Sequence, residues 1–262
     1  AGFLALSLAL AGCQSVTTGD KTGQIGATPA IPASQIVLPS ANQPPAATVL
    51  PQAGQAADAN EGGASLETLN RQADGGDPLA QIRMGLRYAK GRGVPQDDEK
   101  AFDWYRRAAE RNVPLAQFLV AEAHFHGRGV RQDDGEALHW FQQAADQGFT
   151  RAQLMLGTMY ALGRGTGIDP DRAATWYRKA AAWGEADAQY LLGRAYREGD
   201  GVEQDDGKAI EWFMKAARQG HIDAQVMVGL AYQKGRGVEQ DYRKAVVFYG
   251  AAAEDGSAVG SL

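Results

Sequence analysis

The sequence is poor in cysteine and has no run of basic residues. Cys13 is the one cysteine among 262 residues, which excludes an intrachain disulfide and any metal site built from several cysteines. The net charge is −5 and no lysine-rich segment occurs, so the chain lacks the electrostatic footprint of a nucleic-acid-binding protein. We therefore do not expect nucleic acid among its partners.

The chain also lacks an apolar stretch at its N-terminus that is long enough to cross a bilayer. Residues 1–12 are apolar, but a membrane-spanning helix needs about 20 such residues. Their length is typical of the apolar region of a secretory signal, so we interpret 1–12 as the remnant of a signal peptide. No initiator methionine and no Lys or Arg precedes this stretch, so we expect the natural chain to start a few residues earlier.

Cys13 lies at the end of the apolar stretch, in a motif typical of a lipid-anchored protein. Leu10-Ala11-Gly12-Cys13 resembles the lipobox of bacterial lipoproteins. The resemblance implies cleavage before Cys13, lipid on its thiol and acylation of the new amino group. Gln14, in place of an aspartate, favours the outer membrane by the same resemblance, with the chain facing the periplasm. The alternative is that Cys13 is an incidental or buried cysteine.

Residues 13–63 form a second segment of distinct composition. After Cys13 it is rich in Ala, Pro, Gln, Ser, Thr and Gly, and its only charges are Asp20, Lys21, Asp58 and Glu61. Such a segment buries too little apolar surface to order itself, so we predict a disordered tether. A soft linker of about 50 residues has a root-mean-square span of about 40 Å.

A 36-residue period begins at residue 77. Ala-Gln pairs recur at this spacing, at Ala80-Gln81, Ala116-Gln117, Ala152-Gln153, Ala188-Gln189 and Ala224-Gln225. The same shift relates Gly91 and Gly93 to four later glycine pairs, and Trp104 to Trp140, Trp176, Trp212 and Phe248. These motifs closely resemble the Sel-one-like repeat, a relative of the tetratricopeptide repeat, over residues 77–256. The resemblance implies an all-α fold, a right-handed α-solenoid of five helix-turn-helix repeats.

Each copy also predicts its helices from residue chemistry alone. In the first helix, the alanine of the Ala-Gln pair and the residues four and eight positions later line one face, which we predict to be core. The glycine pair is typical of a left-handed helix end followed by a tight return. An aspartate then predicts the N-cap of the second helix, at Asp97, Asp133, Asp169, Asp205 and Asp241. The second helix is predicted to pack Ala101, Trp104, Tyr105, Ala108 and their equivalents inward, so the tryptophans are predicted to be core.

The two ends of the repeat array differ from its middle. Residues 64–76 fit a capping half-repeat, because Leu66, Leu69 and Ala73 lie 36 residues before Phe102, Tyr105 and Ala109. A sixth Ala-Gln pair would fall at 260 and 261, where the sequence reads Gly260-Ser261. We interpret 257–262 as a truncated tail and expect the natural chain to continue beyond Leu262.

Motifs that suggest chemistry are better explained by the fold. The Gly-Arg-Gly loops complete no phosphate-binding pattern and follow no predicted strand. His124 and His126 point to different sides of a helix, and no cluster of carboxylates or cysteines completes a metal site. No serine stands in a nucleophile elbow. We therefore expect no catalytic, cofactor or metal site, and no enzymatic activity.

The first helices also predict a partner-binding groove. Positions −1, +2, +6, +9 and +10 from the alanine lie opposite the core stripe, and the matching positions of tetratricopeptide repeats line the inner groove. In the middle copies they are Leu115, Phe118, Glu122, Phe125, His126, then Arg151, Leu154, Thr158, Ala161, Leu162, then Asp187, Tyr190, Arg194, Arg197, Glu198. We hypothesise that this groove grips an extended or helical segment through apolar anchors, while Arg194 and Arg197 hold an acidic group. The alternative is that the aromatic residues at position +2 pack between adjacent helices.

The leading interpretation is a lipid-anchored scaffold or adaptor in the bacterial envelope, whose partner is a protein or peptide. The resemblance implies roles in organising polysaccharide-secretion or envelope complexes, in envelope signalling or in host interaction, and the sequence does not choose among them. The alternative is a hydrolase of β-lactams or peptidoglycan, as reported for cysteine-rich relatives. Those relatives carry a disulfide in each repeat, and this chain has no cysteine there.

Overall fold

The computed structural model describes residues 65–259, with side chains described as far as Gly256. In this part of the chain there are α-helices and no strands, which confirms the predicted all-α solenoid. The helices are α2 (Leu66–Asp74), α3 (Pro78–Lys90), α4 (Asp98–Ala109), α5 (Pro114–His126), α6 (Asp134–Asp146), α7 (Thr150–Leu162), α8 (Pro170–Ala182), α9 (Ala186–Glu198), α10 (Asp206–Ala217), α11 (Ile222–Lys234) and α12 (Tyr242–Val259). The predictions for 1–12, for Cys13, for the tether and for 260–262 lie outside the described residues.

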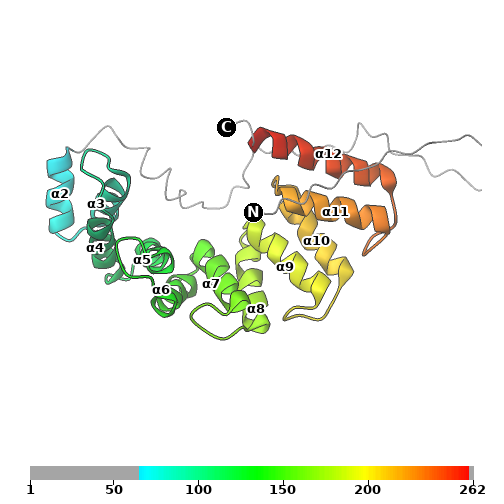
Figure 1. Ribbon diagram of the computed structural model, residues 1–262, viewed down its shortest axis with the longest axis horizontal. Helices are drawn as coiled ribbons and strands as arrows, with labels where there is room; N and C mark the ends of the chain where they lie inside the picture. The colour runs from blue at the N-terminus through cyan, green and yellow to red at the C-terminus, as the bar shows by residue number, and fades with distance from the viewer. Residues whose placement is uncertain (1–64, 260–262) are drawn as a thin grey trace, which may run out of the picture. The chain divides into compact units, whose positions relative to one another are not determined.

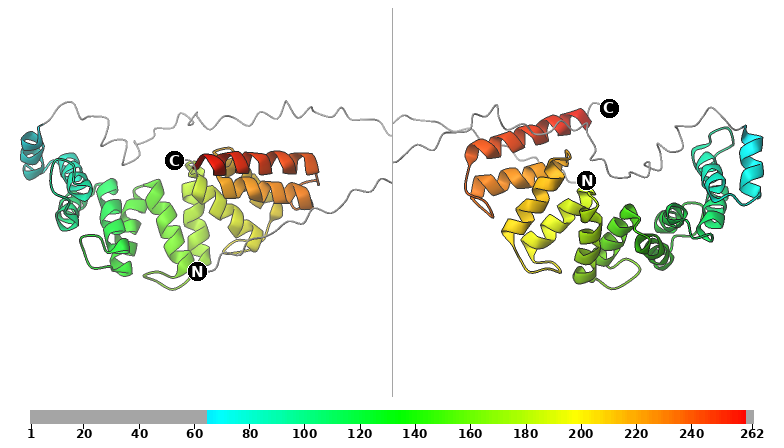
Figure 2. Two further views of the ribbon diagram at one scale, coloured as in Figure 1. Left: turned by 45° about the horizontal axis from the view of Figure 1, so that its top comes forward. Right: turned by 180° about the vertical axis from the view of Figure 1, so that it is seen from behind.

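The helices pack as five pairs in chain order (Figure 1). The pairs are α3 with α4, α5 with α6, α7 with α8, α9 with α10, and α11 with α12. The second helix of each pair also packs against the first helix of the next, so each repeat mainly contacts its neighbours, as the further views show (Figure 2). We call the packing of α5, α6 and α7 the 2–3 junction, and that of α9, α10 and α11 the 4–5 junction.

The predicted helix ends are confirmed. All five aspartates cap their second helix; the Asp97 carboxylate, for example, accepts the backbone N–H of Lys100 at 3.0 Å. The first glycine of each pair ends its helix in the left-handed conformation, with φ between 66° at Gly91 and 77° at Gly199. α12 runs to Val259, three residues past the boundary expected for the last repeat.

The second glycine of each later pair has a further role between repeats. At Gly165, with φ of 70°, a Cβ would collide with the backbone carbonyl of Asp134 at the start of α6. Gly129, Gly201 and Gly237 have the same position against Asp98, Pro170 and Asp206. Glycine is required here because each loop lies directly on the backbone of the preceding repeat.

The tryptophans are less buried than predicted. Trp176 is 8% exposed, whereas Trp104, Trp140 and Trp212 are only half-buried. The aromatic residue that follows each tryptophan is the buried one: Tyr105, Phe141, Tyr177 and Phe213 are at most 7% exposed. Three of these rings face a glycine of the paired helix, such as Gly193 beneath Phe213, which leaves room for a flat ring. The prediction that both aromatic residues pack inward is therefore confirmed for the second residue of each pair and for Trp176, and it is wrong for Trp104, Trp140 and Trp212.

The predicted core stripe of the first helices is confirmed at its centre. Its members four positions after each alanine are at most 2% exposed: Met84, Val120, Leu156, Leu192 and Val228. At the N-terminal end, α2 covers α3 by packing Leu69 and Ala73 against Ala80 and Met84, while Leu66 stays 36% exposed.

The glutamine of the Ala-Gln pair has a structural role that the sequence did not suggest. Gln81, Gln153, Gln189 and Gln225 are buried, and each Nε2 donates a hydrogen bond to a carbonyl in the last turn of the preceding second helix, at 3.1 to 3.4 Å. Each of those carbonyls also accepts the backbone N–H of the glycine that follows the helix, at 3.0 to 3.1 Å, so the glutamine adds a second hydrogen bond there and ties neighbouring repeats together. Among the described residues, no helix is long and apolar enough to span a bilayer.

Candidate partner-binding surface

Two of the aromatic residues predicted to line the groove pack between helices. Phe118 is 5% exposed, and its ring centroid lies 5.6 Å from that of Phe141 and 5.1 Å from that of Phe149. Tyr190 is half-buried and stacks on His221 with a centroid distance of 4.6 Å. For Phe118, the burial matches the alternative interpretation of the +2 aromatic residues.

The remaining residues predicted on α5 and α7 differ in their exposure. Leu115, Glu122, Leu154 and Ala161 are half-buried, while His126, Arg151 and Leu162 are exposed. Burial raises the pKa of the Glu122 carboxyl, although the charges of Arg128 and Arg151 oppose this shift. The half-buried Thr158 donates a hydrogen bond to the Leu154 carbonyl at 3.0 Å.

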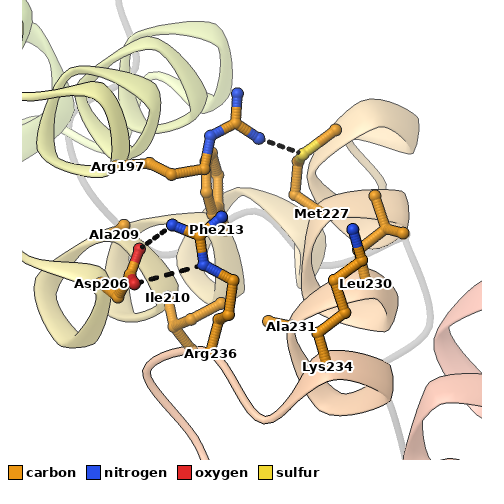
Figure 3. A pocket seen from close by; sticks show the side chains of 10 residues that line it. All are labelled: Arg197, Asp206, Ala209, Ile210, Phe213, Met227, Leu230, Ala231, Lys234 and Arg236. Carbon is orange, nitrogen blue, oxygen red and sulfur yellow. Dashed lines mark hydrogen bonds and ion pairs between the residues drawn. The ribbon is translucent and has the colours of Figure 1, made fainter.

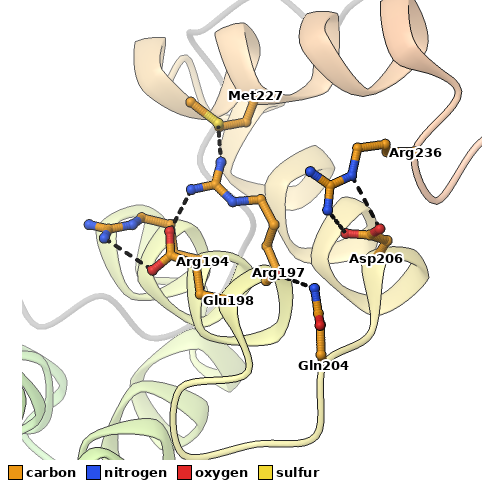
Figure 4. A network of polar contacts seen from close by, with 7 residues as sticks. All are labelled: Arg194, Arg197, Glu198, Gln204, Asp206, Met227 and Arg236. Atoms are coloured by element: carbon orange, nitrogen blue, oxygen red, sulfur yellow. Dashed lines mark hydrogen bonds and ion pairs between the residues drawn. The ribbon is translucent and has the colours of Figure 1, made fainter.

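The two arginines on α9 do meet a carboxylate, but it belongs to the same helix. Glu198 accepts from Arg197 at 2.6 Å and from Arg194 at 3.4 Å (Figure 4). Partial burial opposes ionisation of Glu198, but the hydrogen bonds from the two arginines hold its pKa below the usual value. Arg197 also donates to the sulfur of Met227 on α11 at 2.7 Å. Of the remaining predicted residues, Asp187 is exposed and lies 3.4 Å from the ring of His221.

A pocket of about 130 Å³ lies at the 4–5 junction, beside Arg197 (Figure 3). Its apolar wall is formed by side chains of α10 and α11, among them Ile210, Phe213, Met227 and Leu230. Its charged lining is Arg197, Lys234, Arg236 and Asp206. Arg236 and Asp206 form an ion pair across the two repeats at 3.3 Å. The pocket thus combines an apolar wall with three cations and one carboxylate.

The same position of the 2–3 junction holds an aromatic side chain. Two repeat lengths are 72 residues, so Phe125 is the equivalent of Arg197, and Phe141 is the equivalent of Phe213. The guanidinium of Arg164 lies over the Phe125 ring, 3.6 Å from its centroid, and pairs with Asp134. Phe125 also meets Phe141 edge-on, with 6.3 Å between centroids. At the 2–3 junction, the ring of Phe125 therefore lies beside the interrepeat ion pair.

Of the pocket residues, only Arg197 was predicted from the sequence as a binding residue. Asp206, Phe213, Lys234 and Arg236 were missed, because the prediction followed single helix faces, whereas the pocket draws on two repeats. A column-by-column comparison of the copies would have exposed the exchange of Phe125 for Arg197. Among residues 65–259, no group of His, Cys, Asp and Glu is arranged to hold a metal ion.

Comparisons with known proteins agree with this architecture. The Sel1 repeat model matches residues 78–113, 114–149, 150–182, 186–221 and 222–257. The crystal structure of a protective antigen of uropathogenic Escherichia coli with an SLR fold is 37% identical and superposes with a TM-score of 0.71, over 72% of this chain and 41% of that one. A Sel1 repeat protein from Oxalobacter formigenes is 39% identical with a TM-score of 0.65, over 75% and 60% of the two chains.

A curated relative matches a shorter segment. The secretory immunoglobulin A-binding protein EsiB of Escherichia coli O6:H1 is 40% identical over 47 residues, which are 18% of this chain and 10% of that protein. The chain therefore spans less than two thirds of the length of each of these three relatives.

Proposed function

From the premise that the chain belongs to the Sel1 repeat family, we propose that it is a lipid-anchored interaction scaffold of the bacterial envelope that binds a protein or peptide partner. Sel1 repeats mediate protein–protein interaction. The anchor is Cys13, and the proposed location is the periplasmic face of the outer membrane.

The pocket at the 4–5 junction is the observation that carries this proposal. The conspicuous polar residues of the described repeats already serve the fold: the aspartates cap helices and the buried glutamines bind helix ends. The pocket departs from the repeat pattern, because it replaces a ring with an arginine and leaves space. An open, partly charged concavity between repeats suits a protruding side chain of a partner.

No observation favours the second candidate, a hydrolase of β-lactams or peptidoglycan. The family members that suggested it carry a disulfide in each repeat, and residues 65–259 contain no cysteine. The relative named for binding secretory immunoglobulin A supports a protein partner in general terms. Because that match covers a tenth of the relative, we define the partner of this chain by its chemistry and not by that name.

The test combines localisation with capture. Cells producing the wild-type chain or Cys13→Ser are cross-linked, and their membranes are solubilised and purified through a tag on the chain. We expect the wild type to carry lipid on Cys13 by mass spectrometry and to be recovered with the same partner in near-equal amounts in repeated experiments. Recovery of the wild-type chain alone, or an unlipidated wild type in the soluble fraction, would contradict the proposal.

A further inference from the structure

We propose that the pocket at the 4–5 junction receives an aromatic side chain of the partner, with an acidic residue of the same segment beside it. This inference rests on the proposed function and specifies the partner's chemistry. It follows from the comparison of two junctions in one chain, in which one holds a ring and the other has room for one.

The filled junction defines what the site accepts. At the 2–3 junction, the ring of Phe125 lies beneath the guanidinium of Arg164 and against the edge of Phe141. Arg164 is fixed over the ring, because its Nε donates to Asp134 at 3.0 Å and its Nη2 to the Phe125 carbonyl at 3.4 Å. Cation–π and edge-to-face contacts of this kind each stabilise a ring in place. Phe125 is thus an internal model of the ligand.

The 4–5 junction keeps the same surroundings without the ring. Arg236 pairs with Asp206 as Arg164 pairs with Asp134, and Phe213 occupies the place of Phe141. Arg197, in the place of Phe125, extends its guanidinium to the rim, where it contacts Met227 and Glu198 (Figures 3 and 4). The guanidinium stays 5.9 Å from the Phe213 centroid, and the pocket remains open next to it.

The size of the pocket suits a phenyl or phenol ring. Apolar cavities of about 150 Å³ hold benzene, and this pocket measures about 130 Å³. Met227 and Leu230 add flexible apolar contacts to the wall, and thioether–aromatic contact is favourable. A ring bound here would be covered by Arg236, as Phe125 is covered by Arg164.

The charge of the rim selects an acidic neighbour for that ring. Three cations, Arg197, Lys234 and Arg236, face one carboxylate, Asp206. Lys234 is equivalent to Leu162 of the 2–3 junction, so of these two junctions only the open one has a cation at this position. Among the described carboxylates, none forms an ion pair with Lys234, which is exposed. A carboxylate of the bound segment can therefore pair with Lys234 and share Arg197 with Glu198.

The ring must come from outside the tether of the same chain. Residues 14–63 contain no Phe, Tyr or Trp. The other available source is a second copy, since Trp183 is 71% and Tyr242 is 63% exposed. We favour a partner segment, because the indole of Trp183 is larger than the phenyl ring of Phe125, and the hydroxyl of Tyr242 already accepts a hydrogen bond from Gln240 Nε2 at 2.8 Å.

The test uses the full chain and three labelled peptides. The first is Gly-Ser-Glu-Phe-Glu-Ser-Gly; the second has Ala for Phe, and the third has Lys for both Glu. We expect the first peptide to bind at least tenfold more tightly than either control by fluorescence polarisation. Equal binding of the Phe and Ala peptides, or no binding of any, would overturn the proposal.

A second experiment places a phenylalanine of the chain itself in the pocket. Arg197→Phe reproduces the arrangement of Phe125, so we expect at least a tenfold loss of peptide affinity and an unfolding midpoint equal to or above that of the wild type. Arg178→Phe, at an exposed position of α8, is the matched control and should bind as the wild type does. Unchanged binding by Arg197→Phe would overturn the proposal.

The remaining outcomes separate the two proposals. A dimer in sedimentation that Trp183→Ser dissolves and the Phe peptide does not disrupt would overturn the inference in favour of a second copy. If the envelope partner is captured equally by the wild type and by Arg197→Phe, the inference fails while the proposed scaffold function stands. If the Phe peptide binds selectively but no envelope partner is recovered, the scaffold proposal fails while the preference of the pocket stands.

Discussion

The 2–3 junction and the 4–5 junction are built from equivalent helices, an equivalent interrepeat ion pair and an equivalent buried phenylalanine, yet the first holds the ring of Phe125 beside that pair and the second has a pocket there. The central difference is an exchange on the first helix, Phe125 for Arg197, and it is accompanied by the exchanges of Thr158 for Leu230 and of Leu162 for Lys234 in the lining. The side chain that completes one junction is thus replaced in the other, and a pocket lies beside the replacement. The filled 2–3 junction therefore shows which side chain the pocket of the 4–5 junction lacks.

The floor of the filled junction is expected to contribute most to stability. Phe141 is 0% exposed, so Phe141→Ala should lower the free energy of unfolding by about 3–5 kcal/mol, because a cavity replaces the ring. Trp140→Ala is the control and should cost less, since Trp140 is half-buried. Urea titrations of both variants measure this order, and a larger loss for Trp140→Ala would mean that the tryptophan column is core after all.

The loop that lies on the 2–3 ion pair gives the next largest effect. Gly165→Ala should destabilise by about 1–3 kcal/mol, because φ is 70° and the new Cβ would meet the Asp134 carbonyl. Gly167→Ala, two residues on, has open space around its Cβ and should change the unfolding midpoint little. Equal effects of the two variants in thermal unfolding would show that the loop does not touch the preceding repeat.

Exchanging the distinguishing residues compares the junctions directly. Phe125→Ala removes a half-buried ring that contacts Arg164 and Phe141, so we expect a loss of about 1–2 kcal/mol, less than for a fully buried phenylalanine. Arg197→Ala removes a residue at an open rim and should stay within about 0.5 kcal/mol of the wild type. If Arg197→Ala destabilises as much as Phe125→Ala, the two positions are equally structural and the contrast fails.

The Arg164–Asp134 ion pair of the filled junction should contribute least to the free energy of unfolding, and its contribution should be lost at low pH. Hydrogen bonds from Arg164 hold the pKa of the Asp134 carboxyl below its usual value of about 3.9. A carboxyl with a lowered folded-state pKa adds stability above its unfolded pKa, and this is lost as pH falls through the folded pKa. Asp134→Asn should therefore flatten the stability profile below about pH 4.

The control is the Arg164→Met background. In that background, adding Asp134→Asn should change the dependence of stability on pH much less than it does in the wild type. The pair is about 30% exposed on each side, so we expect a coupling below about 1 kcal/mol in the double-mutant cycle. An acid profile unchanged by Asp134→Asn in the wild-type background would show that the pair does not contribute.

The repeated elements of the fold could be predicted because their causes are local. A left-handed glycine at Gly163 and a capping aspartate at Asp169 are fixed by backbone geometry within a few residues. The error at Trp140 arose because the pattern places both Trp140 and Phe141 inward, and only the packing against the paired helix decides how deeply each of them is buried. The role of the buried glutamines could not be predicted either, because the carbonyls that accept their hydrogen bonds lie in the preceding repeat.

The candidate site was only partly predictable because it depends on side-chain direction across two repeats. The sequence identifies Arg197 as a variable position, but not that its guanidinium turns toward Met227 and leaves a pocket. Phe118 and Phe125 looked equivalent as anchors, yet Phe118 is 5% exposed and Phe125 is half-buried under Arg164. Neither difference is encoded in the position along a single helix.

The most direct test of the contrast between junctions is the methyl NMR spectrum of the protein labelled at its five methionines. Met227 lines the pocket, and Met155 is its equivalent at the filled junction, 72 residues earlier. On titration with the peptide Gly-Ser-Glu-Phe-Glu-Ser-Gly, we expect the Met227 methyl signal to shift through the ring current of the bound phenylalanine, while the Met155 signal stays in place. A spectrum in which Met227 does not move, or in which Met155 moves as far, would contradict the account.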